Sequence, residues 1–208
     1  MTLKVVNLGL PKTGTTTLAR ALRRAGLKTA DHRIRAKQTQ KPDLHGAFVA
    51  DLLYQGFYET GDPGAYLGEF DAVSEMSVLR EGRSLWPQMD FALIDAIRQH
   101  HPGVKFLASS RDPFAISQSM LAWSDLGTAR LPAANVPGLP EGYGETSAQR
   151  IAWIEGHYAH LRALFGDDDD FLQYDVADPT ARDLISGFLE LPVNWWGKAN
   201  VNKLNEVA

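Results

Sequence analysis

Residues 3–18 read LKVVNLGLPKTGTTTL, and this stretch decides the fold that the sequence predicts. The apolar run 3–8 predicts a buried β-strand, and a turn rich in glycine and threonine follows it directly. From Leu18 onward apolar residues recur at helical spacing, and Gly26 stands where a helix-ending glycine belongs. A strand, a tight turn and an amphipathic helix in this order can wrap backbone N–H groups around an anion.

The rest of the chain alternates short apolar runs with longer segments of helical period. This alternation predicts an α/β fold of three layers, with a central, roughly five-stranded parallel sheet flanked by helices. The expected strands are residues 3–8, 27–30, 72–75, 105–110 and 171–174. The expected helices after the first one are residues 43–58, 87–100, 114–126, 146–165 and 179–189.

The length of 208 residues favours one domain that covers residues 1–208. Two stretches, residues 60–68 and 127–144, interrupt the alternation of strands and helices. Loops of that length either cover an active site or form surface loops. We expect both to face the substrate, and we expect specificity to come from residues 43–68 and 127–144.

Composition limits the class of partner and the compartment. The formal net charge of −4 argues against general nucleic-acid binding, which needs a basic face. The chain has no cysteine, so it has no disulfide framework and no thiolate nucleophile. No apolar run is long enough for a membrane helix. We expect a cytoplasmic protein that acts on a small molecule or glycan.

The loop Gly9-Leu10-Pro11-Lys12-Thr13-Gly14-Thr15-Thr16 differs from the loop that binds nucleotide triphosphates, Gly-x-x-x-x-Gly-Lys-Ser/Thr. Both glycines are in place, but the lysine is Lys12 instead of the residue after Gly14. A triphosphate loop uses its late lysine and a bound magnesium ion to neutralise several charges. A sulfuryl group carries less charge, so lysine, hydroxyls and amides suffice without metal. The alternative is a tight turn that only caps the helix.

This loop resembles that of the P-loop sulfotransferase family, whose members open on a strand ending in Pro-Lys-Thr/Ser-Gly-Thr-Thr and continue into a helix. The resemblance implies that the donor is 3′-phosphoadenosine 5′-phosphosulfate, released as adenosine 3′,5′-bisphosphate, and that no metal is required. It also implies that Lys12 stabilises charge on the bridging oxygen as the sulfuryl group leaves. The loop residues that it implies for donor binding are Pro11, Lys12, Thr13, Gly14, Thr15, Thr16 and Thr17.

A second motif, Arg111-Asp112-Pro113, follows the predicted strand 105–110. Pro113 suits the first turn of a helix, which puts Ser119 about two turns along it, while Arg111 projects from the strand end. A guanidinium fork and a hydroxyl can then meet one phosphate. The sulfotransferase family has an arginine and a serine at this separation as its clamp on the 3′-phosphate, which implies this role for Arg111 and Ser119. The alternative is a surface ion pair between Arg111 and Asp112.

The C-terminal segment 194–203 also resembles family tails that fold over the nucleotide. Lys198 or Asn200 would then add a donor to the 3′-phosphate. One of the adjacent residues Trp195 and Trp196 would approach the adenine, or both would close the core.

A general base must take the proton from the attacking hydroxyl or amine. In sheets that carry a nucleotide-binding loop, the third strand lies beside the first, which would place Glu75 next to Lys12. Glu75 is the first candidate base, and an ion pair with Arg80 or Arg83 is the alternative. His32, just past the second strand, is the second candidate, with a polar loop histidine as the alternative.

The sequence therefore predicts a sulfotransferase that acts on a hydroxyl or amine of an unidentified acceptor. One rival is a phosphoryl-transferring P-loop kinase or nucleotide hydrolase with an altered loop. The other is a non-catalytic nucleotide-binding protein.

Overall fold

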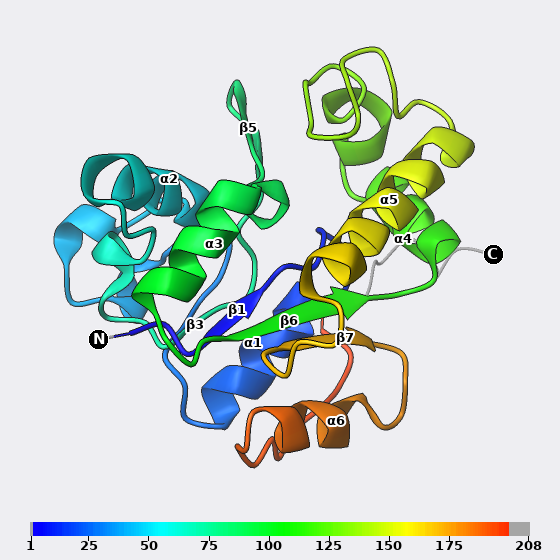
Figure 1. Cartoon of the computed structure of the whole chain (residues 1–208). Helices are drawn as coiled ribbons and strands as arrows, with labels where there is room; N and C mark the ends of the chain where they lie inside the picture. The colour runs from blue at the N-terminus through cyan, green and yellow to red at the C-terminus, as the bar shows by residue number, and fades with distance from the viewer. Residues whose placement is uncertain (1, 200–208) are drawn as a thin grey trace.

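The strand that opens the sequence, β1 (Val5–Asn7), lies at the centre of a five-stranded parallel sheet (Figure 1). This structure is a computed structural model, which describes residues 2–199. The strand order is β2-β3-β1-β6-β7, so the third strand lies beside the first as predicted. The other strands of the sheet are β2 (Thr29–Ala30), β3 (Ala72–Val73), β6 (Lys105–Ser110) and β7 (Phe171–Asp175).

Helices cover both faces of this sheet, which confirms the predicted α/β architecture (Figure 1). Successive strand residues point to opposite faces, so each strand contributes to two cores. One core packs Val5, Ala72, Leu107 and Tyr174 against α1 (Thr15–Arg24) and α6 (Ala181–Phe188). The other packs Val6, Val73, Phe106 and Ala108 against α2 (Val49–Thr60), α3 (Phe91–His100) and α5 (Ser147–Phe165). Burial on both faces explains why the strands read as continuous apolar runs.

Three predicted helices begin or end elsewhere in the structure. The expected helix 43–58 is a 3-10 turn, Pro42–Leu44, followed by α2, because Gly46 has a φ of 81° that a right-handed helix excludes. The helix expected from residue 87 begins at Phe91, since Asp90 caps it by accepting from Leu93 N at 3.3 Å. Helix α4 (Pro113–Leu121) stops five residues short of residue 126, where a π-helical turn, Leu126–Arg130, begins.

The sequence analysis missed a short antiparallel hairpin of β4 (Val78–Arg80) and β5 (Arg83–Leu85). Its turn residues Glu81 and Gly82 have φ values of 57° and 75°, and two positive φ angles match the twist of a tight hairpin. The hairpin is followed by Trp86, whose ring lies 5.5 Å from that of Trp153 on α5.

Residues 60–68 correct the expected placement of a substrate-facing loop. Asp62 Oδ1 lies 2.9 Å from His101 Nε2, and His101 Nδ1 accepts from Leu3 N at 3.1 Å. Leu3 precedes β1, so this segment lies at the amino ends of the strands, opposite the loop that contains Lys12. Within residues 2–199, no helix has the length and apolar character needed to span a membrane.

Candidate active site

Two glycines shape the loop between β1 and α1. A Cβ atom on Gly9 would lie 2.3 Å from Ser109 Oγ, so the close approach of the loop to β6 requires glycine. Gly14 has a φ of 89°, and a Cβ there would lie 2.5 Å from Val176 Cγ2. Gly14 is also the N-cap of α1 and offers no side-chain acceptor to the first-turn N–H groups. The start of α1 therefore favours an anion as the group that satisfies those donors.

Asn7, at the end of β1, holds the loop through its fully buried side chain. Its Nδ2 donates to Ser74 O on the β3 side at 2.9 Å and to Ser109 Oγ of β6 at 3.1 Å. Its Oδ1 accepts from Gly9 N at 3.3 Å and from Ser109 N at 3.0 Å. One amide thus ties the ends of three strands to the first turn of the loop.

Thr13 corrects one prediction about the loop hydroxyls. Its Oγ1 donates to Leu10 O at 2.6 Å and lies 2.8 Å from Ser109 Oγ, and the residue is fully buried. The hydroxyl of Thr13 therefore stabilises the loop itself, because it points toward β6. Thr15, Thr16 and Thr17 do line the cavity described below.

Helix α5 supports the loop from one face of the sheet. His157 Nε2 donates to Leu8 O at 2.8 Å, and Tyr158 OH donates to Ser109 O at 2.6 Å while it accepts from Leu10 N at 3.4 Å. Burial lowers the pKa of His157 to about 4, so the ring is neutral at pH 7. The sequence analysis did not find this role for His157 and Tyr158.

Lys12 has an unusual backbone and a shielded ammonium group. Its φ of 74° lies in the left-handed region, which residues other than glycine rarely adopt and which is often found at functional sites. Its Nζ lies 3.6 Å from the centre of the Trp123 ring. Burial lowers the pKa of Lys12 to about 8. The negative charge of Glu75 opposes this shift, and the positive charge of Arg111 adds to it. The three charged groups are therefore close enough to influence one another.

A cavity of about 1770 Å³ opens at the carboxyl ends of the strands, the edge where ligands bind in open α/β sheets. Its lining includes eleven of the predicted site residues: Pro11, Lys12, Gly14, Thr15, Thr16, Thr17, His32, Glu75, Arg111, Ser119 and Lys198. Thr13 is not part of the lining. Asn200 lies outside the described residues.

Glu75 lies at the end of β3, next to the Lys12 loop. Its Oε1 accepts from Ser77 N at 3.2 Å and from Ser77 Oγ at 2.5 Å, and the Thr15 side chain also hydrogen-bonds to this carboxylate. Burial raises the pKa of Glu75, and the hydrogen bonds from Ser77 and the charge on His32 oppose that shift. A carboxylate with a raised pKa that faces a lysine is suited to accept a proton.

The alternative ion pairs for Glu75 are not formed. Arg80 Nε lies 3.4 Å from Glu81 Oε1, its own neighbour in the hairpin turn. Arg83 Nη1 lies 2.8 Å from Asp51 Oδ2 on α2. In the hairpin that the sequence analysis missed, both arginines pair with carboxylates other than Glu75.

His32 follows β2 and lies close to Glu75. Its Nδ1 is 2.9 Å from Ser77 O, and because a carbonyl oxygen only accepts, Nδ1 carries the proton. In this tautomer Nε2 is the ring nitrogen that can accept a proton. Ser77 thus contacts both candidate bases.

Arg111 and Ser119 lie where the second motif predicted them. Arg111 directly follows β6, Ser119 is on α4, and both are partly exposed in the cavity wall. Asp112 is the N-cap of α4 and accepts from Ala115 N at 2.8 Å, which is a different use from the surface ion pair considered as an alternative.

The C-terminal segment reaches the cavity through residues 196–199. Thr17 Oγ1 donates to Gly197 O at 3.0 Å, which holds the segment against the start of α1. Trp196 both lines the cavity and packs 5.9 Å from the ring of Tyr174. Lys198 is exposed at the cavity rim.

Several lining residues were not predicted. From residues 127–144 the lining includes Arg130, and from residues 43–68 it includes none. Contributors outside those two stretches include the arginines Arg20, Arg23, Arg33, Arg35 and Arg80, the acidic residues Asp31, Glu81, Asp125 and Asp178, and the apolar residues Leu79, Trp86, Trp123 and Leu126. A signal in the sequence was the segment 33–41, which holds four cationic residues and no acidic one.

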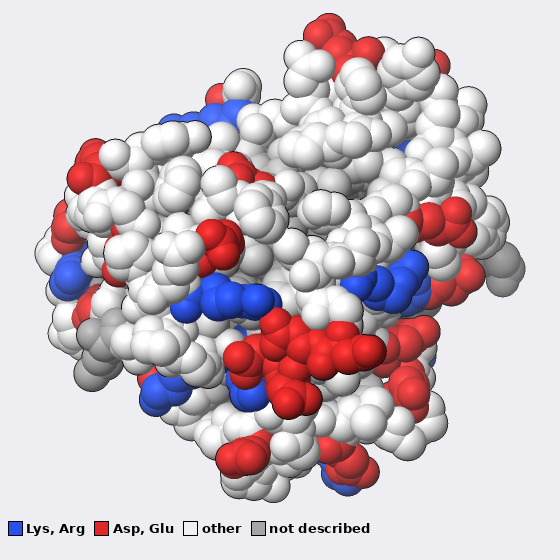
Figure 2. Space-filling view, in the orientation of Figure 1, with Lys and Arg blue, Asp and Glu red and all other residues white. Residues whose placement is uncertain are grey.

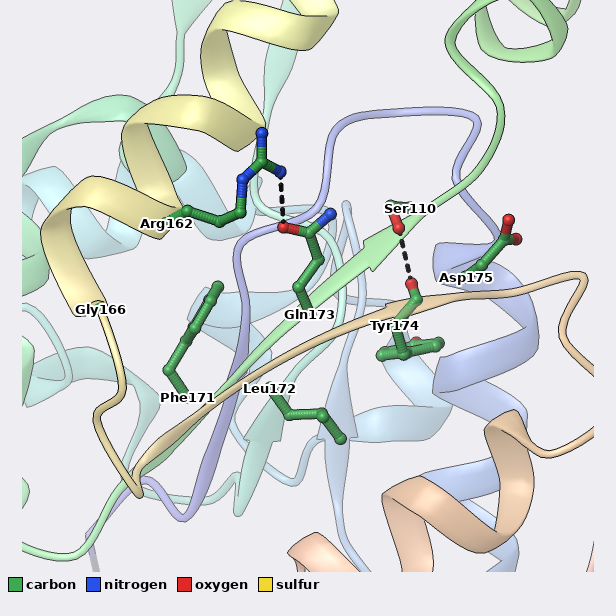
Figure 3. A pocket seen from close by; sticks show the side chains of 8 residues that line it. All are labelled: Ser110, Arg162, Gly166, Phe171, Leu172, Gln173, Tyr174 and Asp175. Carbon is green, nitrogen blue, oxygen red and sulfur yellow. Dashed lines mark hydrogen bonds between the residues drawn. The ribbon is translucent and has the colours of Figure 1, made fainter.

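A second hollow, of about 490 Å³, lies along β7, the last strand of the sheet (Figure 3). Figure 3 shows Arg162 pointing to Gln173 and Ser110 pointing to the backbone of β7. Arg162 Nη1 donates to Gln173 Oε1 at 3.1 Å, and Ser110 Oγ donates to Tyr174 O at 2.8 Å. These polar groups satisfy one another, and the hollow contains none of the predicted site residues. Across residues 2–199 no cluster of three histidine or acidic side chains is placed to bind a metal ion.

A family model described as a sulfotransferase domain matches residues 4–206 of the chain. Among solved structures, the chain is similar to an unliganded sugar kinase from Janibacter sp. HTCC2649. The two are 19% identical in sequence, the match covers 92% of this chain and 96% of that one, and the TM-score is 0.45. No curated protein matches the chain. The family match includes the loop that contains Lys12, the candidate bases and the pair Arg111 and Ser119.

Proposed function

Because the chain belongs to the sulfotransferase domain family, we propose that it transfers a sulfuryl group from 3′-phosphoadenosine 5′-phosphosulfate to a hydroxyl or amine of a small molecule or glycan. The observation that supports this most directly is that Lys12, Arg111 and Ser119 line one cavity although they come from separate parts of the chain. The same cavity contains both candidate bases, so donor-binding and proton-accepting groups meet there.

In this proposal a nucleotide with anionic groups at both ends occupies the cavity. In this proposal the uncapped start of α1 and Lys12 bind the 5′-phosphosulfate, because N–H donors and a helix dipole favour an anion there. Arg111 and Ser119 bind the 3′-phosphate through a two-pronged guanidinium and a hydroxyl. Lys198, at the cavity rim, adds a cation for the same 3′-phosphate.

The chemical step requires charge stabilisation and a proton acceptor. The acceptor oxygen or nitrogen attacks sulfur, the bond from sulfur to the bridging phosphate oxygen breaks, and adenosine 3′,5′-bisphosphate leaves. Lys12 stabilises the negative charge that builds on that bridging oxygen. A donor aimed at developing charge typically contributes on the order of 10² to 10³ in rate.

Glu75 or His32 takes the proton from the acceptor. Glu75 is the stronger candidate, since burial raises its pKa and it lies within electrostatic range of Lys12. His32 has a fixed tautomer that leaves Nε2 as the acceptor. The two share Ser77 as a hydrogen-bond partner, so one side chain orients both.

The test of this function measures binding and turnover without metal. Calorimetry with adenosine 3′,5′-bisphosphate in the presence of a chelator should give tight binding. Transfer of ³⁵S from the labelled donor to a panel of alcohols, amines and sugars should follow. Turnover that requires both ATP and a divalent ion would favour a kinase or hydrolase instead. Binding of the bisphosphate without transfer to any acceptor would favour a non-catalytic nucleotide-binding protein.

A further inference from the structure

Four arginines line the cavity on its β2 side: Arg20, Arg23, Arg33 and Arg35. Arg20 and Arg23 are three residues apart on α1 and so lie on the same face of that helix. Arg33 and Arg35 follow β2, just past His32. We call these four residues the β2-side arginines.

Few acidic groups neutralise the β2-side arginines. Asp31 Oδ2 lies 2.8 Å from Arg23 Nη2 and 4.0 Å from Arg35 Nη2, so one carboxylate serves two guanidinium groups. Arg33 Nε donates to Gly46 O at 2.6 Å, a neutral acceptor, and the ion pairs of residues 2–199 give Arg20 no carboxylate. All four side chains remain exposed enough to meet a ligand.

The charge of the cavity is opposite to the charge of the whole chain. Nine lysine or arginine side chains and five acidic side chains line it, whereas the chain has a formal net charge of −4. The acidic excess lies elsewhere. Figure 2 shows acidic side chains gathered over the turn between α5 and β7, where residues 167–170 are all aspartates. This turn lies at the amino ends of the strands, away from the cavity.

The order of strands separates the β2-side arginines from the proposed donor site. The Lys12 loop follows β1 at the centre of the sheet. On one side of that loop, Arg111 follows β6. Residues 176–179, which also line the cavity there, follow β7. Glu75 follows β3 and the β2-side arginines surround the end of β2, on the other side. An acceptor between the candidate bases and the open edge of β2 would therefore contact these arginines.

We propose that the acceptor is a polyanion whose carboxylate, sulfate or phosphate groups bind the β2-side arginines while its hydroxyl or amine faces Glu75 and His32. This inference rests on the proposed function, since it assigns the donor to the β6 side of the cavity. The cavity volume of about 1770 Å³ exceeds the range of about 300 to 1,000 Å³ common for one small ligand, which gives room for both. Arginine forks bind planar carboxylates and phosphates in two-pronged geometry, which favours these groups as partners.

The experiment titrates protein saturated with adenosine 3′,5′-bisphosphate, so that the donor side is filled. Three probes are compared by calorimetry: trigalacturonate, inositol 1,4,5-trisphosphate and neutral galactotriose. At least one of the two anions should bind roughly tenfold more tightly than galactotriose, and its affinity should fall as salt is added. Tighter binding of trigalacturonate indicates a carboxylate-bearing acceptor, and tighter binding of the trisphosphate indicates a phosphate-bearing one.

Two double variants with equal loss of charge separate a local effect from a general one. Arg20→Gln with Arg35→Gln should weaken binding of the preferred anion roughly tenfold, because two partly exposed charge pairs are lost. Arg98→Gln with Arg182→Gln is the control, since these residues pair with Asp168 and Asp183 outside the cavity. The control should leave anion binding unchanged.

The outcomes distinguish the inference from the function on which it rests. Equal affinity for galactotriose and both anions overturns the polyanionic acceptor, as does an equal loss in both double variants. If the bisphosphate still binds, neither result contradicts the proposed donor site. Failure of the bisphosphate to bind the unmodified protein overturns the proposed function itself.

Discussion

The ammonium group of Lys12 lies 3.6 Å from the centre of the Trp123 ring, on the segment that follows α4. Trp123 keeps 44% of its surface exposed, so its ring forms part of the open cavity wall. A ring face attracts a cation but replaces only part of the water that would surround it. Burial accordingly lowers the pKa of Lys12 to about 8, and this makes the charge of the proposed catalytic lysine sensitive to mildly alkaline pH.

Binding of adenosine 3′,5′-bisphosphate should take up protons above pH 8. In the free protein Lys12 loses its proton as the pH rises through about 8. An anion bound at the loop favours the charged form of Lys12 and raises its pKa, so the complex holds more protons than the free protein. Calorimetry at pH 8.5 in two buffers of different ionisation enthalpy measures this uptake. The same uptake in Lys12→Ala would assign the proton to another group.

Replacing Lys12 with alanine should reduce sulfuryl transfer by at least on the order of 10² to 10³, because the charge on the bridging oxygen loses its partner. The fold should survive, since the Lys12 side chain is only partly buried. Steady-state transfer from the ³⁵S-labelled donor and a thermal melt give the two measurements. Lys41→Ala, a change at an exposed lysine outside the cavity lining, is the matched lysine variant and should retain most of the rate. Native-like turnover in Lys12→Ala would contradict the mechanism.

Replacing Arg111 with lysine should weaken binding of adenosine 3′,5′-bisphosphate, because one ammonium cannot reproduce a two-pronged guanidinium. The expected loss is roughly tenfold, the scale of one charge-assisted hydrogen bond. Adenosine 5′-monophosphate provides the control ligand, because it lacks the 3′-phosphate. Its affinity should be the same in both proteins. An equal loss for both ligands would remove Arg111 from the 3′-phosphate site.

The parts of the site that could be predicted from sequence are those fixed by local rules. The loop at Gly9 and Gly14 follows from steric demands that only glycine meets, and the neighbouring position of β3 placed Glu75 beside Lys12. The arginines on the β2 side could not be assigned, because exposed arginines on a helix usually face water. Their meeting in one cavity depends on how α1 and the end of β2 pack together.

The internal supports of the loop were also beyond sequence reasoning. Asn7 is a polar residue inside an apolar run, and His157 and Tyr158 lie on a helix of mixed composition. Each forms hydrogen bonds with backbone groups distant in sequence. The hairpin of β4 and β5 was missed because its strands are too short for an alternating pattern to be visible. In this hairpin Arg80 pairs with Glu81, and Arg83 pairs with Asp51, so the ion pairs considered as the alternative for Glu75 are not formed.

Glu75→Gln and His32→Gln should separate the two candidate bases. The glutamine in Glu75→Gln has the same size as the glutamate but cannot take a proton. If Glu75 is the base, this variant should therefore have a lower maximal rate at every pH. The base acts in its deprotonated form, so the rate of the unmodified protein should fall on the acid side. The burial that raises the Glu75 pKa moves this limb to higher pH than a free carboxylate would give.

The variant that lacks the acid limb in a plot of kcat/KM against pH identifies the base. If Glu75→Gln retains both the rate and the limb while His32→Gln loses them, His32 is the base and Glu75 only orients Ser77. Unchanged profiles in both variants would contradict the proposed proton transfer. Glu81→Gln, a change in the hairpin turn at the cavity rim, is the carboxylate control and should leave the limb in place.

Replacing Asn7 with alanine should destabilise the protein and loosen the loop together. The change removes four hydrogen bonds and leaves buried partners on Ser74, Ser109 and Gly9 without the Asn7 amide. Unsatisfied buried groups cost about 1 to 3 kcal/mol each, so a loss of roughly 3 kcal/mol in the free energy of unfolding is expected. Urea denaturation measures it, and Asn194→Ala, at an exposed position, should change stability by no more than about 0.5 kcal/mol.

The role of Asn7 in holding the loop has a readout that stability alone does not move. Bisphosphate affinity should fall in folded Asn7→Ala, because Gly9 N loses its acceptor and the start of the loop is no longer tied to β6. Leu93→Ala, a core substitution on α3 far from the loop, serves as a comparison of similar expected destabilisation. It should retain affinity under conditions where both variants are folded. Equal affinity in the two variants would show that Asn7 acts on the fold alone. If Asn7→Ala does not fold, Ser109→Ala tests the loop instead, because it removes only the Oγ of this hydrogen-bond network.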